Sequence, residues 1–424
     1  MLNYHKGTGE YRNWILTEET FHSGHLGKCE SIMALGNGYL GLRSAAEEPY
    51  VLETRGMFVS GTYNRFDSRE VTELPNTADI SEMRIYLNSE LFSLEKGKIL
   101  EYSRSLNLKD AELIRNIVWQ SPGGESYRLE FKRFVSLEDL HAVAFKISIE
   151  PLSCNAAVRI KTGIDGRMTN SGSQHFSEGD KRVYDRKFLQ LVQTTTESKI
   201  DFVANCCCVC TLPFTRKDFF LERRSIFGIY EFNAVKNTRV TFEKYASVFT
   251  SRDREYIGKY SLETLKENSL KHINTVCSES YDILFERSRL MWRKYWEDAG
   301  IKLVSRNGFD VLSLRFAQYH LRTMIPVHDE RFNIGAKALT GEGYKGHVFW
   351  DTELFILPYF QYNFPGIARQ LLKYRHLTLD GARNNAVKYG YKGAMYPWET
   401  AFTGGDETPG WAAINIVTGK PTRV

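Results

Sequence analysis

Three absences limit the class of protein to which this sequence belongs. No run of 18 apolar residues occurs, so a membrane-spanning helix of ordinary length is not expected. Residues 1–11 contain no apolar core of the kind found in signal peptides. The formal net charge is +5, but no basic run with interleaved aromatic residues occurs, which argues against nucleic acid as a partner. We therefore expect a cytoplasmic protein that binds neither a membrane nor nucleic acid.

The sequence also lacks a cluster of metal ligands. Of its seven cysteines, four crowd together at Cys206, Cys207, Cys208 and Cys210. No histidine or second cysteine pair stands near them at ligand spacing. Neighbouring residues of a strand point to opposite faces, so this run cannot pair within itself. We predict a buried strand here, no metal, and no disulfide framework.

Length and patterning predict more than one domain. A chain of 424 residues is too long for one ordinary core, and 42% hydrophobic with 25% charged residues is typical of a soluble globular protein. Up to about residue 255, short runs alternate apolar and polar residues, as in residues 145–150, and turn clusters such as residues 121–124 separate them. This pattern predicts an antiparallel β-sandwich.

One glycine-rich motif needs a separate interpretation. Residues 36–41 fit the pattern G-x-G-x-x-G, which in dinucleotide-binding proteins ends a strand and opens a helix. Here at most two helical turns fit before Pro49, and no alternation of parallel strands and helices surrounds the motif. We interpret the glycines as serving a tight turn.

The pattern becomes helical near residue 260. Residues 261–297 contain no glycine or proline, and apolar residues recur at helical spacing. One long helix or two consecutive helices fit this segment, with Ser261 as the N-cap and Gly300 as the C-terminal stop. Further helices are predicted over residues 309–324, 351–360, 365–374 and 380–389, with Pro358 kinking the second. Glycine-rich, aromatic loops between them are the expected place for a site.

Two loops place an indole next to a carboxylate, at Trp350-Asp351 and at Trp398-Glu399. An indole covers the apolar face of a pyranose, and a carboxylate accepts two hydroxyl groups. The alternative is purely structural: Asp351 caps a helix beside a packed Trp350, and Trp398 packs down in a rigid turn after Pro397. The residues alone leave both interpretations open.

Three stretches resemble glycoside hydrolase family 65, the disaccharide phosphorylases of maltose, kojibiose and trehalose. They are residues 25–43, 339–353 and 393–399. The resemblance implies a multidomain β + α protein. Its parts are an N-terminal β-supersandwich over residues 1–255, a helical linker over 256–300, and the first part of a truncated (α/α)6 barrel over 301–424.

The resemblance also implies a function. An inverting phosphorylase uses inorganic phosphate as co-substrate, without a cofactor, to convert an α-linked glucose disaccharide to β-glucose 1-phosphate and glucose. Trp350 and Asp351 would bind the glucosyl unit, with Trp398 and Glu399 nearby. The family's general acid is expected beyond Val424, so we expect no catalytic residue and no activity in this chain alone, and a homodimer in the full-length form. The alternatives are an α-glucoside hydrolase of the same family and a non-catalytic sugar-binding remnant.

Overall fold

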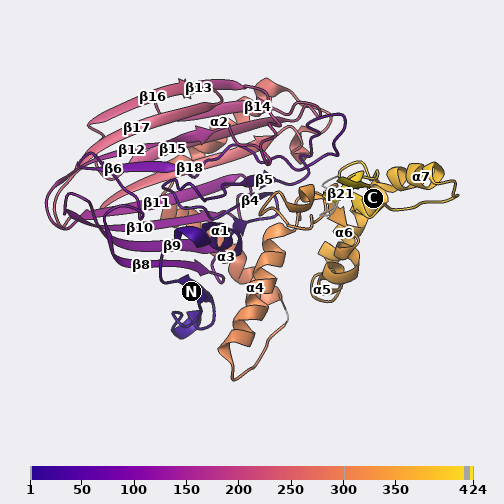
Figure 1. Ribbon diagram of the computed structural model, residues 1–424, viewed down its shortest axis with the longest axis horizontal. Coiled ribbons are helices and arrows are strands. Elements are labelled where there is room, and N and C mark those ends of the chain that lie inside the picture. The colour runs from indigo at the N-terminus through magenta and orange to yellow at the C-terminus, as the bar shows by residue number, and fades with distance from the viewer. Residues whose placement is uncertain (1, 300, 415–420, 424) are drawn as a thin grey trace.

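The structure is a computed structural model that describes residues 2–299, 301–414 and 421–423, with side chains as far as residue 410. Two large antiparallel sheets are stacked on one another, and the helices that follow residue 308 gather at one end of them (Figure 1). The strand-rich first half and helical second half agree with the β plus α class expected from the sequence.

The larger sheet has ten antiparallel strands. In spatial order they are β1 (Leu2–Asn3), β2 (Ile15–Glu18), β8 (Lys98–Asn107), β9 (Glu112–Gln120), β10 (Ser126–Val135), β11 (Ala142–Pro151), β18 (Val240–Thr250), β15 (Asp201–Cys210), β14 (Phe188–Thr194) and β13 (Asp180–Tyr184). The alternation in residues 145–150 falls inside β11, which confirms the strand predicted there.

The second sheet has five strands and covers the inner face of the first. In spatial order they are β16 (Arg216–Glu222), β17 (Ser225–Ala234), β12 (Ala156–Asp165), β6 (Met83–Leu87) and β7 (Glu90–Leu91). Ile147 and Phe242 from the larger sheet and Ile160 and Tyr230 from the smaller one belong to the same buried apolar cluster. The sandwich therefore encloses the main core.

A small three-stranded sheet contains the glycine-rich motif. Its strands are β3 (Leu35–Gly36), β4 (Leu40–Leu42) and β5 (Met57–Val59), and residues 36–41 make the turn from β3 to β4. Gly38 has a φ of +88°, and a Cβ there would overlap the carbonyl of Ile325. The motif is thus a tight turn that lets the segment after the first C-terminal helix approach closely, as the sequence predicted.

Eight helical segments of five residues or more complete the described chain. They are α1 (Leu26–Ile32), α2 (Leu262–Ser278), α3 (Tyr281–Asp298), α4 (Gly308–Met324), the π-helical turn η5 (Thr352–Ile356), α5 (Leu357–Asn363), α6 (Pro365–Leu377) and α7 (Leu379–Lys388). Shorter elements are η1 (Gly9–Tyr11), η2 (Ser23–His25), η3 (Arg254–Tyr256), η4 (Gly343–Gly346), and the strands β19 (Val348–Phe349), β20 (Glu399–Thr400), β21 (Trp411–Ile414) and β22 (Pro421–Arg423).

Helices α2 and α3 are two separate helices, one of the two arrangements predicted. Ser261 caps the first by accepting from the Thr264 N–H, and Ser280 caps the second by accepting from the Ile283 N–H. The expected stop at Gly300 lies outside the described residues. Apolar side chains of both helices, such as Ile273 and Leu284, pack on the outer face of the ten-stranded sheet. That sheet is therefore covered on both faces.

The cysteine-rich run forms the buried strand β15, as predicted, but one expectation needs correction. Cys206 and Cys208 face the sandwich core, whereas Cys207 faces helix α2. There it forms a disulfide with Cys277, and the two Cα atoms are 6.5 Å apart. The partners are separated by 70 positions in sequence, so no local spacing predicts the bond.

The helix after Trp350 also differs from its prediction. Asp351 has helical torsion angles and its side chain makes no capping bond, because the first helical hydrogen bond already runs from the Leu354 N–H to the Trp350 carbonyl. Asp351 as an N-cap was therefore wrong. The π-helical turn η5 ends at Ile356, two residues before Pro358, which occupies the first turn of α5. Among the described residues, no helix combines the length and the apolar character needed to cross a membrane.

Glu112 on β9 makes the stability of this fold depend on pH. Its carboxylate is buried and accepts from the Tyr281 hydroxyl at 2.9 Å. Burial raises the pKa of Glu112 from 4.5 to about 7, against the opposing effects of Lys132 and that hydrogen bond. Because Glu112 binds its proton more tightly in the folded protein than in the unfolded chain, protonation stabilises the folded state. This contribution to the free energy of unfolding is complete below pH 4.5 and is lost as the pH rises through 7. We expect a loss of about 3 kcal/mol from this group.

Urea unfolding of the wild type and of Glu112→Gln between pH 5 and 8 measures this effect. The variant should gain stability relative to the wild type as the pH rises, because its amide cannot ionise. Glu267→Gln, at an exposed position of α2, serves as the control and should run parallel to the wild type. A constant difference between Glu112→Gln and the wild type across this range would contradict the expectation.

Candidate functional site

A two-stranded ribbon brings the two tryptophan-acid stretches together. Strand β19 pairs antiparallel with β20, with Val348 opposite Thr400 and Phe349 opposite Glu399. Trp350 follows Phe349 and Trp398 precedes Glu399, so the two tryptophans meet at the end of the ribbon. Their rings are 5.2 Å apart at 87°, and each side chain is exposed, by 43% and 47% respectively. Two distant stretches of sequence thus form one aromatic surface.

His347 holds the ribbon from within. Its imidazole is fully buried, with Nδ1 at 2.8 Å from the Glu399 carboxylate and Nε2 at 2.5 Å from the Thr72 carbonyl. The Thr72 N–H in turn donates to the Glu407 carboxylate at 2.9 Å. One side chain therefore joins β19 to β20 and joins both to a loop of the N-terminal half.

A second polar contact fixes the start of the helix after Trp350. Arg375 on α6 donates to both carboxylate oxygens of Glu353, at 2.9 and 2.8 Å. The same guanidinium donates to the Phe349 carbonyl at 3.1 Å. Paired contacts of this kind fix orientation as well as distance. They set the direction of the backbone that carries Trp350 and Asp351.

The predicted residues fall into two environments. Trp350, Asp351 and Trp398 are exposed, and Asp351 has no hydrogen-bond partner among the side chains that the structure describes. Glu399 is mostly buried, and its carboxylate accepts from His347. The arrangement presents two indole rings beside one open carboxylate, which suits a hexopyranose ring and its hydroxyls. Sugar binding by these residues stays a prediction.

Sequence reasoning missed the residues that support this surface. His347 and Glu353 lie within three residues of the Trp350-Asp351 pair, one on each side. These two polar residues could have been recognised from the sequence as candidates for supporting the pair. Arg375 stands 22 positions after Glu353 on another helix, and no local pattern connects the two.

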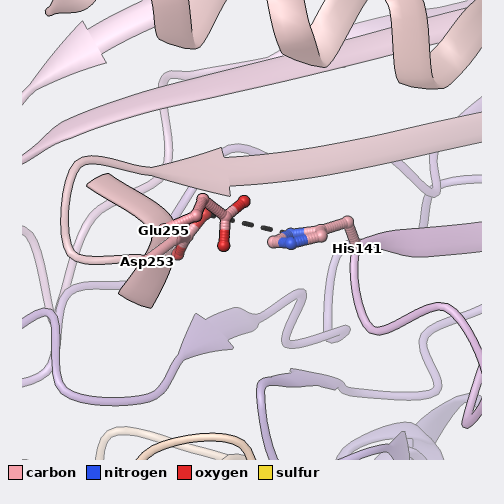
Figure 2. A group of neighbouring side chains, drawn as sticks. All are labelled: His141, Asp253 and Glu255. Carbon is pink, nitrogen blue, oxygen red and sulfur yellow. Dashed lines mark ion pairs between the residues drawn. The ribbon is translucent and has the colours of Figure 1, made fainter. Parts of the chain in front are cut away.

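A separate group of possible metal ligands lies in the N-terminal half (Figure 2). His141, Asp253 and Glu255 each offer a ligand atom, and these atoms lie within 4.8 Å of one another. Asp253 is already engaged, since it accepts from the Tyr39 hydroxyl at 3.0 Å and from the Thr250 N–H and hydroxyl at 2.9 and 2.7 Å. Burial raises the pKa of Asp253, although His141 and Thr250 favour its charged form. These hydrogen bonds give Asp253 a structural role in a turn.

Comparisons with known proteins agree with this architecture. Residues 16–295 match the Glycosyl hydrolase family 65 N-terminal domain, and residues 315–423 match the Glycosyl hydrolase family 65 central catalytic domain. A kojibiose phosphorylase from Halothermothrix orenii is 47% identical over 100% of this chain and 55% of its own length. One from Escherichia coli is 39% identical over 96% of this chain and 53% of its own.

A solved structure of a human-microbiome protein assigned as a kojibiose phosphorylase superposes with a TM-score of 0.85 at 21% identity. The match covers 94% of this chain and 53% of that one, which establishes the shared fold. The chain spans about half the length of the curated relatives that it matches. Because the two family matches cover most of the sequence, the chain belongs to glycosyl hydrolase family 65.

Proposed function

We propose that this chain serves the inverting phosphorolysis of an α-linked glucose disaccharide, with kojibiose as the substrate to test first. Membership of the family and the two kojibiose phosphorylases at 47% and 39% identity support the substrate class. The observation that carries the proposal is the exposed pair Trp350 and Trp398 beside the open carboxylate of Asp351.

In this proposal the aromatic surface binds the glucosyl unit. The Trp350 ring covers the apolar face of the sugar, and Asp351 accepts two of its hydroxyls. Trp398 extends the same surface. The carboxylate of Glu399 is hydrogen-bonded to His347. Through this bond Glu399 fixes the ribbon that carries both rings.

The reaction requires one acid and one nucleophile. An oxygen of inorganic phosphate attacks the anomeric carbon from the face opposite the bond that breaks, and the leaving oxygen takes a proton from a carboxylic acid. The products are β-glucose 1-phosphate and glucose. Asp351 is open to solvent and Glu399 is bonded to His347, so we assign the acid to neither. The family resemblance assigns it to a segment after the Trp398-Glu399 loop.

The finer architecture belongs to the same proposal. Residues 1–255 would form the supersandwich, 256–300 the linker, and 301–424 the first part of an (α/α)6 barrel. The helices α4, α5, α6 and α7 and the match of residues 315–423 to the catalytic domain support the last part. The homodimer implied by the resemblance stays a prediction.

Calorimetric titration of the chain with kojibiose tests the binding surface. Trp350→Ala should weaken binding about tenfold, because it removes the ring that stacks on the sugar. Asp351→Asn should weaken it by a similar factor, about tenfold, because hydrogen bonds to a charged acceptor are lost. Tyr362→Ala, at an exposed ring on α5 that is not part of the ribbon, should bind as the wild type does. Equal affinities in all three variants would refute the role of the pair.

Assays of product formation test the reaction. A chain extended by the C-terminal half of the Halothermothrix orenii relative should release β-glucose 1-phosphate from kojibiose only when phosphate is present. Proton NMR of the first product identifies the anomer and hence the inversion. The 424-residue chain alone should fall below the extended chain by a factor of about 10² or more, because general acid catalysis is missing. Phosphate-independent release of glucose would show a hydrolase instead.

A further inference from the structure

A cavity of about 670 Å³ lies where the N-terminal half meets the turn that precedes β19. Two exposed aromatic rings form part of its wall, Phe66 at 47% and Tyr344 at 59% exposure. Charged side chains of the same wall include Asp67, Glu70, Glu73 and Lys345. The proposed reaction uses none of these residues, so the cavity needs an explanation of its own.

The turn that carries Tyr344 is held in an unfavourable conformation. Tyr344, Lys345 and Gly346 have successive φ values of +56°, +53° and +73°, and two of the three carry a side chain. Such conformations persist only where surrounding contacts hold them, and they cluster at ligand sites. Here the Lys345 carbonyl accepts from the Leu74 N–H at 2.9 Å, and the Gly346 carbonyl accepts from the Tyr63 hydroxyl at 2.6 Å. These contacts fix the turn against the N-terminal loop.

The charges of the cavity favour a neutral ligand. Four acidic and two basic side chains line it, which leaves two negative charges in excess. Lys345 is positioned between two of the acids, with its Nζ 3.8 Å from Glu70 and 3.7 Å from Glu73. Burial opposes the ionisation of Glu73, but a hydrogen bond from His175 and the charge of Lys345 hold the pKa of Glu73 below its usual value. An excess of carboxylates repels phosphate and accepts hydroxyl groups.

A row of contacting aromatic rings links the wall of the cavity to the tryptophan pair. Tyr344 contacts Phe349 at 5.5 Å, Phe349 contacts Trp398 at 5.4 Å, and Trp398 contacts Trp350 at 5.2 Å. Phe349 is buried between the two exposed ends. The row therefore ends in one exposed aromatic surface at the cavity and another at the ribbon.

We propose that this cavity is a second saccharide-binding site, in which Phe66 and Tyr344 cover the apolar faces of a neutral gluco-disaccharide and Asp67 and Glu70 accept its hydroxyls. Binding there needs neither phosphate nor a general acid, so the site goes beyond the phosphorolysis proposed above.

Titration with kojibiose in a Trp350→Ala background tests this site apart from the ribbon. Binding should remain in that background, and adding Phe66→Ala should weaken it about fivefold, because an aromatic face is lost. Phe220→Ala is the matched control, since Phe220 is a comparably exposed ring on β16. It should leave the affinity unchanged. Loss of all binding in Trp350→Ala alone would overturn the second site and leave the first intact.

An isosteric variant guards against damage to the fold. Glu70→Gln keeps the shape of the side chain and should weaken kojibiose binding about threefold or more by removing a charged acceptor. Inorganic phosphate, titrated alone into the Trp350→Ala chain, should not bind. An unchanged kojibiose affinity in both Phe66→Ala and Glu70→Gln, or phosphate binding that Glu70→Gln strengthens, would overturn the proposal.

Discussion

The site depends on the buried imidazole of His347. Its two nitrogens face oxygens from residues far apart in sequence, the Glu399 carboxylate and the Thr72 carbonyl. A buried polar group that loses its partner costs about 1–3 kcal/mol. The pairing of β19 with β20 and the contact of both with the N-terminal half are therefore coupled, because the same ring makes them together.

The segment between β5 and β6 in the N-terminal half supports the site. Tyr63 and Leu74 hydrogen-bond to the turn before β19, and both belong to a small apolar cluster with Leu339 and Ala401, residues from the helical half. The aromatic surface and the cavity beside it are consequently built at the junction of the two halves. The two proposed sugar-binding places therefore lie along a single row of rings.

Local patterns predicted the elements better than their contacts. Period-two alternation identified β11, and the absence of glycine and proline in residues 261–297 identified α2 and α3, because both signals lie within a few residues. The pairing of Glu399 with His347 depends on the register of a ribbon whose two residues are separated by 52 positions in sequence. The Cys207–Cys277 bond and the cavity between Phe66 and Tyr344 are long-range in the same way. The sequence predicted Trp350 and Asp351 as a candidate site, but it could not predict which acid would be open and which engaged.

Cross-linking at the end of the ribbon tests the central claim most directly, namely that the two tryptophan stretches form one surface. Positions 350 and 398 are next to the cross-strand pair Phe349 and Glu399, on the same side of it. Both side chains are exposed. A Trp350→Cys/Trp398→Cys variant should form a disulfide between these positions under mild oxidation, as peptide mapping by mass spectrometry will show. A Trp350→Cys/Tyr362→Cys variant should not. If the first variant stayed reduced, or cross-linked no faster than the second, the ribbon and the surface built on it would be contradicted.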